Sequence, residues 1–137
     1  MEQSDFLQRQ LDLLGRILGK ALTDLLGIKN NSQIIEEFET IHQIVTNELN
    51  ISLKELIELK KEAFIELVTS NPKFNLTNIE KLATLFFVMA RKQNNENSIS
   101  YFNKSLYLFE HVNLKNQTYS SEREKIIAEI KATIHLN

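Results

Sequence analysis

Residues that break regular secondary structure are scarce in this chain, and their scarcity limits its fold more than any other feature. The 137 residues include only one proline and three glycines. Tight turns between strands depend on these two residue types, so the chain has little material for a β fold. Asparagines separate the apolar stretches instead, at positions 30–31, 50, 71, 94–95, 113 and 116. The sequence therefore predicts an all-α fold of about six helices arranged as antiparallel hairpins.

Length and composition are those of one ordinary globular domain spanning residues 1–137. Hydrophobic residues make up 42% of the chain and charged residues 25%, both typical of soluble domains. The formal net charge is −2 and no basic stripe is present, which argues against nucleic acid as a partner. The absence of cysteine excludes disulfides, thiolate nucleophiles and cysteine-based zinc sites.

Targeting signals are also absent from the sequence pattern. The first residues are polar and acidic, unlike a signal peptide. No apolar run approaches the roughly 20 residues that span a bilayer. We therefore expect a cytoplasmic protein that does not insert into a membrane.

The first long apolar stretch, residues 4–27, is predicted to be the central helix of the domain. One stripe recurs at alternating spacings of four and three and consists of Leu7, Leu11, Leu14, Leu18, Ala21 and Leu25. A second stripe beside it contains Gly15, Gly19, Leu22 and Leu26. Because a helix that is apolar on more than one side must be covered from more than one side, we expect the other helices to pack around it.

Gly15 and Gly19 form a small-xxx-small pair within this helix. Each glycine costs roughly 1 kcal/mol relative to alanine in a helix interior, a cost that is tolerable where another backbone comes close. The neighbour is either another helix of the same chain or a symmetric second chain. In the second case the self-association residues are Leu11, Gly15, Leu18, Gly19 and Leu22. Gly19-Lys20 does not match a phosphate-binding loop, whose spacing and following hydroxyl residue are missing.

Two pairs of opposite charge lie on the same predicted helix at a spacing of four residues. They are Asp5 with Arg9 and Asp12 with Arg16. Such pairs stabilise a helix by a few tenths of a kcal/mol each and are typical of a solvated face.

Hydroxyl and amide residues indicate where the later helices begin. Ser52 and Glu55 form a capping box, so a helix is expected to start at Leu53. Residues 53–69 form either one helix or two that break near Leu59. Similar boxes at Thr77 and Ser121 predict a helix over 78–92 and a closing helix over 121–135. A second helix is expected over 32–49 and another over 98–112.

The helix predicted over 78–92 is apolar on nearly all sides from Leu82 to Ala90. It and the following helix, residues 79–112, resemble one tetratricopeptide repeat, a helical hairpin with large and small residues at set positions. Large residues stand where that family has them at Leu82, Leu85, Met89 and Phe102, and small ones at Ser98 and Ser105. Phe86 departs from the pattern, because the family usually has glycine or alanine there.

The resemblance implies a groove that binds a helix or peptide. The ligand-facing positions of the family fall on Glu80, Ala83, Phe87, Ala90 and Arg91. The family's carboxylate clamp is missing, because Ala83 and Phe87 replace its lysine and asparagine. The alternative is that Phe87 belongs to the core. The chain also resembles small bacterial helical proteins that end in such a hairpin, which implies no activity.

Catalytic and metal-binding patterns are weak. Glu39 and His42 have the E-x-x-H spacing of carboxylate-bridged di-iron bundles, but those sites require a second such pair and further carboxylates. We expect no catalytic residues, no metal and no cofactor. The expected function is a non-catalytic protein–protein interaction module. The alternatives are a structural homodimer formed through the first helix and a small-ligand-binding domain with a pocket beside helix 78–92.

Overall fold

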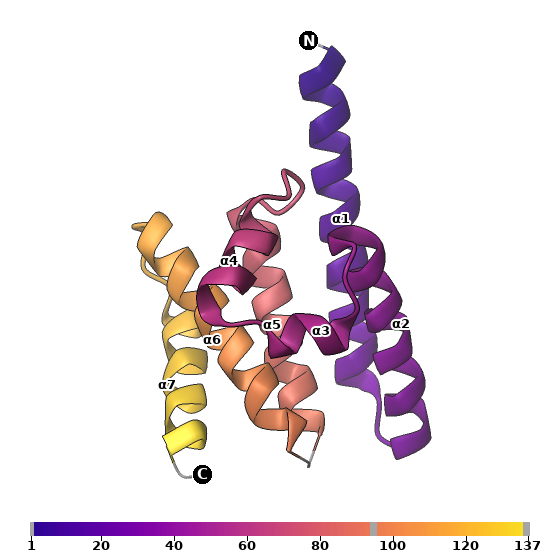
Figure 1. The fold of residues 1–137 in the computed structure, drawn as a ribbon, viewed down its shortest axis with the longest axis vertical. Helices are drawn as coiled ribbons and strands as arrows, with labels where there is room; N and C mark the ends of the chain where they lie inside the picture. Colours follow the sequence, from indigo (N-terminus) through magenta and orange to yellow (C-terminus); the bar gives the residue numbers. More distant parts are fainter. Residues whose placement is uncertain (1, 94–95, 136–137) are drawn as a thin grey trace.

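The computed structural model describes residues 2–93 and 96–135, and within them the side chains from residue 5 onwards. This part of the chain forms seven helices and no strand, which confirms the predicted all-α fold (Figure 1). The helices are α1 (Glu2–Gly27), α2 (Asn31–Leu49), α3 (Leu53–Glu58), α4 (Lys61–Thr69), α5 (Leu76–Lys92), α6 (Asn97–Lys115) and α7 (Ser121–His135).

Helix α5 lies at the centre of the fold, between α1 on one side and α6 on the other (Figure 1). All six residues from Leu85 to Ala90 are buried, so every side of this helix is covered. The expectation that the first helix is central is therefore wrong. In α1 only one face is buried, at Leu14, Leu18, Ala21 and Leu25, and Leu26 on the second stripe is exposed.

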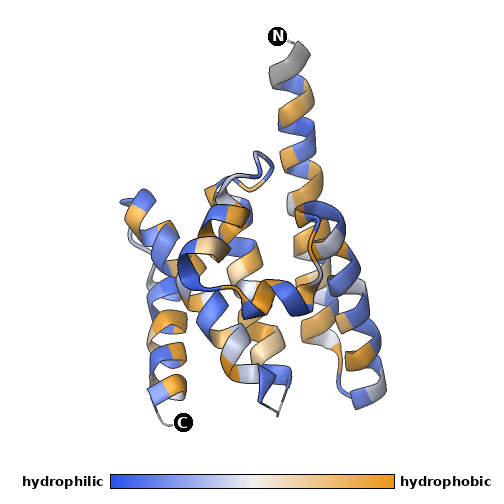
Figure 2. Cartoon of the chain, viewed as in Figure 1, coloured by the Kyte–Doolittle hydropathy of each residue, from blue (hydrophilic) through white to orange (hydrophobic). Residues whose placement is uncertain are grey.

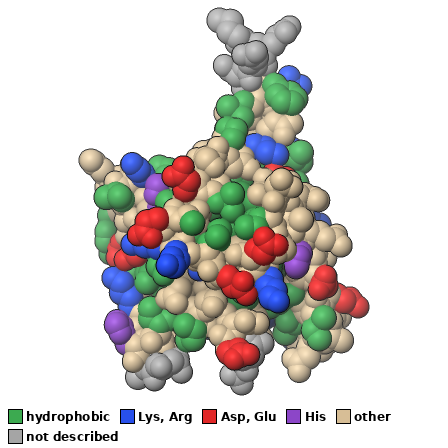
Figure 3. Space-filling model, viewed as in Figure 1, with side chains coloured by type: hydrophobic (Ala, Val, Ile, Leu, Met, Phe, Trp, Pro, Cys, Tyr) green, Lys and Arg blue, Asp and Glu red, His purple; other side chains and the backbone are tan. Residues whose placement is uncertain are grey.

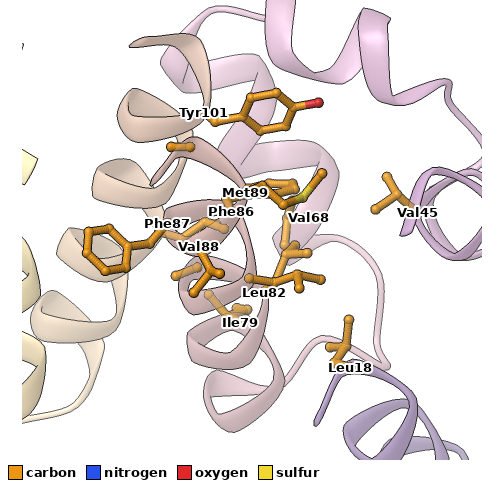
Figure 4. Packing of buried hydrophobic residues seen from close by; sticks show 14 of the residues in the cluster. Leu18, Val45, Val68, Ile79, Leu82, Phe86, Phe87, Val88, Met89 and Tyr101 are labelled. Atoms are coloured by element: carbon orange, nitrogen blue, oxygen red, sulfur yellow. The ribbon is translucent and has the colours of Figure 1, made fainter. Parts of the chain in front are cut away.

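The core is built from side chains that converge on α5 from α1, α2, α4 and α6 (Figure 4). Phe64 of α4 packs against Phe86 of α5 with ring centroids 6.3 Å apart, and against Tyr107 of α6 at 6.5 Å. Phe86 in turn meets the edge of Tyr101 at 5.9 Å. This aromatic chain joins three helices, as expected for rings that prefer tilted or edge-to-face contacts.

The two glycines of α1 have different surroundings. A Cβ added to Gly15 would lie 3.0 Å from the Asn78 side-chain oxygen and 3.1 Å from the Lys81 ammonium, both on α5. A Cβ on Gly19 would meet nothing within 4 Å. Gly15 therefore allows close approach of side chains from α5. The expected close approach at Gly19 is wrong.

Helix starts partly follow the predicted caps. Ser52 accepts a hydrogen bond from the Glu55 backbone N–H at 3.1 Å, and α3 begins at Leu53 as predicted. Residues 53–69 form two helices, because the chain is extended at Leu59 and Lys60.

Two of the predicted caps are displaced along the chain. Asn75, not Thr77, caps α5 by accepting from the Asn78 N–H at 2.9 Å. Ser120, not Ser121, accepts from the Arg123 N–H ahead of α7. In both cases another side chain that can cap stands one or two residues earlier, and the helix starts there.

The displaced cap of α5 can be tested with two alanine substitutions. Asn75→Ala should lower the free energy of unfolding by about 1 kcal/mol, because a helix N–H loses its acceptor. Thr77→Ala should leave stability unchanged or raise it slightly, since alanine has the higher helix propensity. Urea unfolding of both variants measures the difference. The reverse order of stabilities would place the start of α5 at Thr77.

Candidate functional site

The groove that the resemblance to a tetratricopeptide repeat implied on residues 79–112 is filled by core side chains. Ala83, Phe87 and Ala90 are all buried, and Phe87 is only 5% exposed. Its ring meets the edge of Phe102 on α6 at 6.1 Å, and the Arg91 guanidinium covers it from outside at 5.4 Å. The expectation that these residues line a partner groove is therefore corrected, because α6 packs where the partner would lie.

Glu80, another expected groove residue, holds α7 against α5. Both of its carboxylate oxygens accept from Nη1 of Arg123 at 3.1 Å. Arg123 is 4% exposed, and it also donates to the Asn113 side-chain oxygen at 2.6 Å and to the Thr118 carbonyl at 2.8 Å. Every arm of this buried guanidinium is thus paired, which is the condition under which a buried charge is tolerated.

The expected self-association stripe on α1 packs largely inside the molecule. Leu18 is 1% exposed and faces the core, and Gly15 lies against α5. Leu11, Gly19 and Leu22 are half-buried. The Lys81 ammonium donates to the Gly15 carbonyl at 3.2 Å and the Asn78 amide to the Leu11 carbonyl at 3.0 Å. The expectation that these five residues form a free surface for self-association is therefore wrong, because α5 covers much of that surface.

The first turns of α1 are the part of this helix that the body leaves uncovered. The helix projects beyond all the others at its amino-terminal end (Figure 1), with hydrophobic side chains along the projecting part (Figure 3). Phe6 is 61% exposed, Leu13 47% and Leu7 38%. We call Phe6, Leu7 and Leu13 the α1 tip face. Figure 2 shows apolar residues continuing along α1 past the body of the protein.

Sequence reasoning placed Leu7 on the core stripe and assigned Phe6 and Leu13 to no surface. Phe6 and Leu13 are seven residues apart and lie on one helix face, together with Gln10 and the half-buried Ile17. That spacing was visible in the sequence. What was missing is the point on α1 at which the cover by α5 begins, and no local pattern in α1 reports it.

Charged residues run along the flank of the α1 tip face. Asp5, Arg9, Asp12 and Arg16 alternate in sign and are all exposed. The Asp12 carboxylate accepts from the Gln8 amide at 2.9 Å, and Arg9 Nε donates to the Asp5 backbone carbonyl at 3.4 Å. Among the described side chains, no two of these four charges form an ion pair with each other. Their charges therefore remain available to a partner.

Beside the tip, a cavity of about 560 Å³ lies between α1 and the start of α5. Polar and charged side chains, including Gln8, Asp12, Arg16 and Thr77, make up most of its lining. Small-molecule pockets are lined predominantly by apolar side chains with a few polar groups. The composition of this cavity is the opposite, which weakens the small-ligand alternative at this position.

Titratable groups elsewhere are perturbed by burial. Desolvation raises the pKa of Tyr101 to about 12, and a hydrogen bond with Gln93 opposes the shift. Burial lowers the pKa of Lys104, whose ammonium stacks 5.6 Å from the ring centres of Phe64 and Tyr107. Both side chains serve the aromatic core.

The described residues hold no group of three or more His, Asp or Glu placed to bind a metal ion. Glu39 is exposed and His42 half-buried on α2. Within the part of the chain that the structure describes, no helix has the length and apolar character to cross a membrane.

The Arg123 network should carry measurable stability. Arg123→Ala should lower the free energy of unfolding by about 3 kcal/mol, because Glu80 loses its partner and α7 loses its attachment to α5. Lys131→Ala on the same helix is the control. Its contact with Glu110 is at 4.0 Å, and the two side chains are 51% and 40% exposed, so the expected change is below about 0.5 kcal/mol. Equal losses in the two variants, measured by urea unfolding, would contradict the structural role of the network.

The chain matches no protein-family model, and no curated protein or solved structure matches it either.

Proposed function

We propose that this protein is a non-catalytic protein–protein interaction module and that it binds its partner through the α1 tip face. The observation that carries the proposal is the exposure of Phe6 and Leu13 on a helix that extends past its own domain. Single exposed apolar residues are ordinary on a protein surface. Three that share one end of a projecting helix are not, and exposed apolar clusters of this kind mark interaction sites.

Helix physics supports the same proposal. An isolated helix shorter than about 12–15 residues is marginal in water, so the projecting turns are helical only because the buried part of α1 nucleates them. Exposed apolar side chains add nothing to the stability of the folded chain. A partner that covers the α1 tip face gains their burial, at about 25 cal/mol per Å² of apolar surface. An amphipathic helix that docks its apolar face is a recurring mode of recognition.

Photo-crosslinking in cells tests the proposal directly. A photoreactive amino acid in place of Phe6 or Leu13 should yield a protein adduct on illumination. The same group in place of Lys125, an exposed residue of α7, is the control and should give only background. Adduct formation at positions 6 and 13 no greater than at position 125 would contradict the proposed surface. An adduct with any protein, including another copy of this chain, supports it.

Stability measurements separate a binding role from a packing role. Phe6→Ser and Leu13→Ser should change the free energy of unfolding by no more than about 0.5 kcal/mol, as for other exposed positions. Leu14→Ala is the matched control, because Leu14 is 1% exposed and its truncation should cost about 2–5 kcal/mol. A comparable loss for Phe6→Ser at low protein concentration would show that Phe6 packs within the chain.

A further inference from the structure

We infer that the partner of the α1 tip face is a second copy of this chain, with the two α1 helices running antiparallel. This second copy is the partner that the proposed function, binding through the α1 tip face, requires. The flank beside the tip face carries Asp5, Arg9, Asp12 and Arg16 at spacings of four, three and four. The order of signs is therefore minus, plus, minus, plus.

This order is complementary to itself when it is reversed. In an antiparallel pair that places Arg9 opposite Asp12 of the second copy, Asp5 lies opposite Arg16 of the second copy. The two-fold axis repeats both contacts, so four ion pairs form from one alignment. In a parallel two-fold pair this flank of each copy faces the opposite flank of the other, so the four charges of one copy do not meet those of the second. Charge thus selects the antiparallel arrangement, as flanking charges do in helix pairs generally.

The apolar side chains fit the same alignment. The two-fold axis passes between positions 10 and 11, so the two copies of Gln10 lie beside it. Phe6 of each copy lies within roughly 3 Å, along the helix axis, of Leu13 of the other copy. A glutamine amide both donates and accepts hydrogen bonds, so two symmetry-related Gln10 side chains can pair with each other. One polar residue in an apolar seam is a known device for setting register. The half-buried Gln10 stands between the two exposed apolar residues of its helix face.

The flank also distinguishes a second copy from other occupants. Its four charges sum to zero, so neither an anionic lipid surface nor a uniformly acidic or basic protein is favoured. The complementarity lies in the alternation, and this chain carries the matching alternation itself. The overlap of residues 5–16 spans roughly 17 Å of helix at 1.5 Å per residue. That length is short for a stable interface, so the dimer should be weak, with a dissociation constant of micromolar order or above.

Charge reversal tests the inference with two complementary variants. Asp5→Arg/Asp12→Arg makes the flank entirely positive, and Arg9→Asp/Arg16→Asp makes it entirely negative. Each variant alone should sediment as a monomer at concentrations where the natural chain dimerises. Their equimolar mixture should recover a dimer at least as tight as that of the natural chain. Helix content from circular dichroism verifies that both variants are folded.

An exchange elsewhere on α1 provides the matched control. Lys20 and Asp24 form an ion pair at 2.7 Å on the exposed surface. Lys20→Asp/Asp24→Lys exchanges its charges away from the tip and should leave the dimer unchanged. Two monomeric variants that stay monomeric when mixed would overturn the antiparallel charge pairing.

A single cysteine reports the orientation, because the chain has no cysteine of its own. Gln10→Cys should form a disulfide-linked dimer under mild oxidation, since the two copies of position 10 lie roughly 1.5 Å apart along the helix axis, on either side of the two-fold axis. Phe6→Cys should not, because antiparallel helices hold the two copies of position 6 roughly 14 Å apart along the helix axis. Linkage at both positions would indicate a parallel pair and contradict the inference.

The two proposals can fail separately. If the natural chain remains a monomer at millimolar concentration, the second copy is excluded as the partner. If positions 6 and 13 nevertheless crosslink to a different protein in cells, the α1 tip face is still an interaction surface, but its partner is that protein. If neither position crosslinks above the control, both proposals fail together.

Discussion

The structure depends on one requirement, which is that α5 be covered on every side. Leu82, Leu85, Phe86 and Met89 are each no more than 1% exposed. Burying a large aliphatic or aromatic side chain is worth about 1.5–3 kcal/mol, so no arrangement that leaves one side of α5 in water can compete. Helices α1 and α6 flank α5, and α4 adds Phe64 to the same core. Ser105 allows α6 to come close, donating to the Ala83 carbonyl of α5 at 2.7 Å.

The same requirement explains why α1 has a free end. Helix α5 has 17 residues and α1 has 26. At 1.5 Å per residue, their lengths are about 26 Å and 39 Å. An antiparallel or parallel partner of 17 residues therefore leaves roughly 13 Å of α1 uncovered. The contact of Asn78 with the Leu11 carbonyl marks where cover begins, and Phe6 and Leu7 lie beyond it. Leu13 lies level with the start of α5 but on the side of α1 that faces solvent. The exposure of Phe6 and Leu7 follows from this difference in length.

Periodicity and breakers predict the helices best where a capping side chain stands at the helix end. Asn30, Asn50 and Ser52 stand at the ends they were expected to mark. Local signals fail where two candidate caps compete, as with Asn75 and Thr77, since the choice depends on where the helix meets α1. Long-range pairing is less visible still. Nothing local to Arg123 announces its contact with Glu80, 43 positions away in the chain.

The site was predictable in part. Self-association through α1 was one of two alternatives that its stripes left open, and its residues were placed largely on turns that α5 covers. The stripe from Leu7 to Leu25 is uniform in sequence, so it cannot report which turns are paired within the chain. The apolar run from Leu82 to Ala90 had the same ambiguity. From the sequence alone, the side of this helix that carries Phe87 could belong to the core or line a groove. The structure shows that α6 covers Phe87. Both errors come from reading a helix without its neighbours.

Amide hydrogen exchange along α1, measured at low and high protein concentration, tests the division of this helix most directly. Local stability differs along a helix according to how well each turn is covered. The account predicts that amides of residues 6–13 exchange much faster than those of residues 18–25 in dilute solution. At high concentration only the first set should slow down. Uniform protection along α1 that does not change with concentration would contradict the claim that its first turns are uncovered and available to a partner.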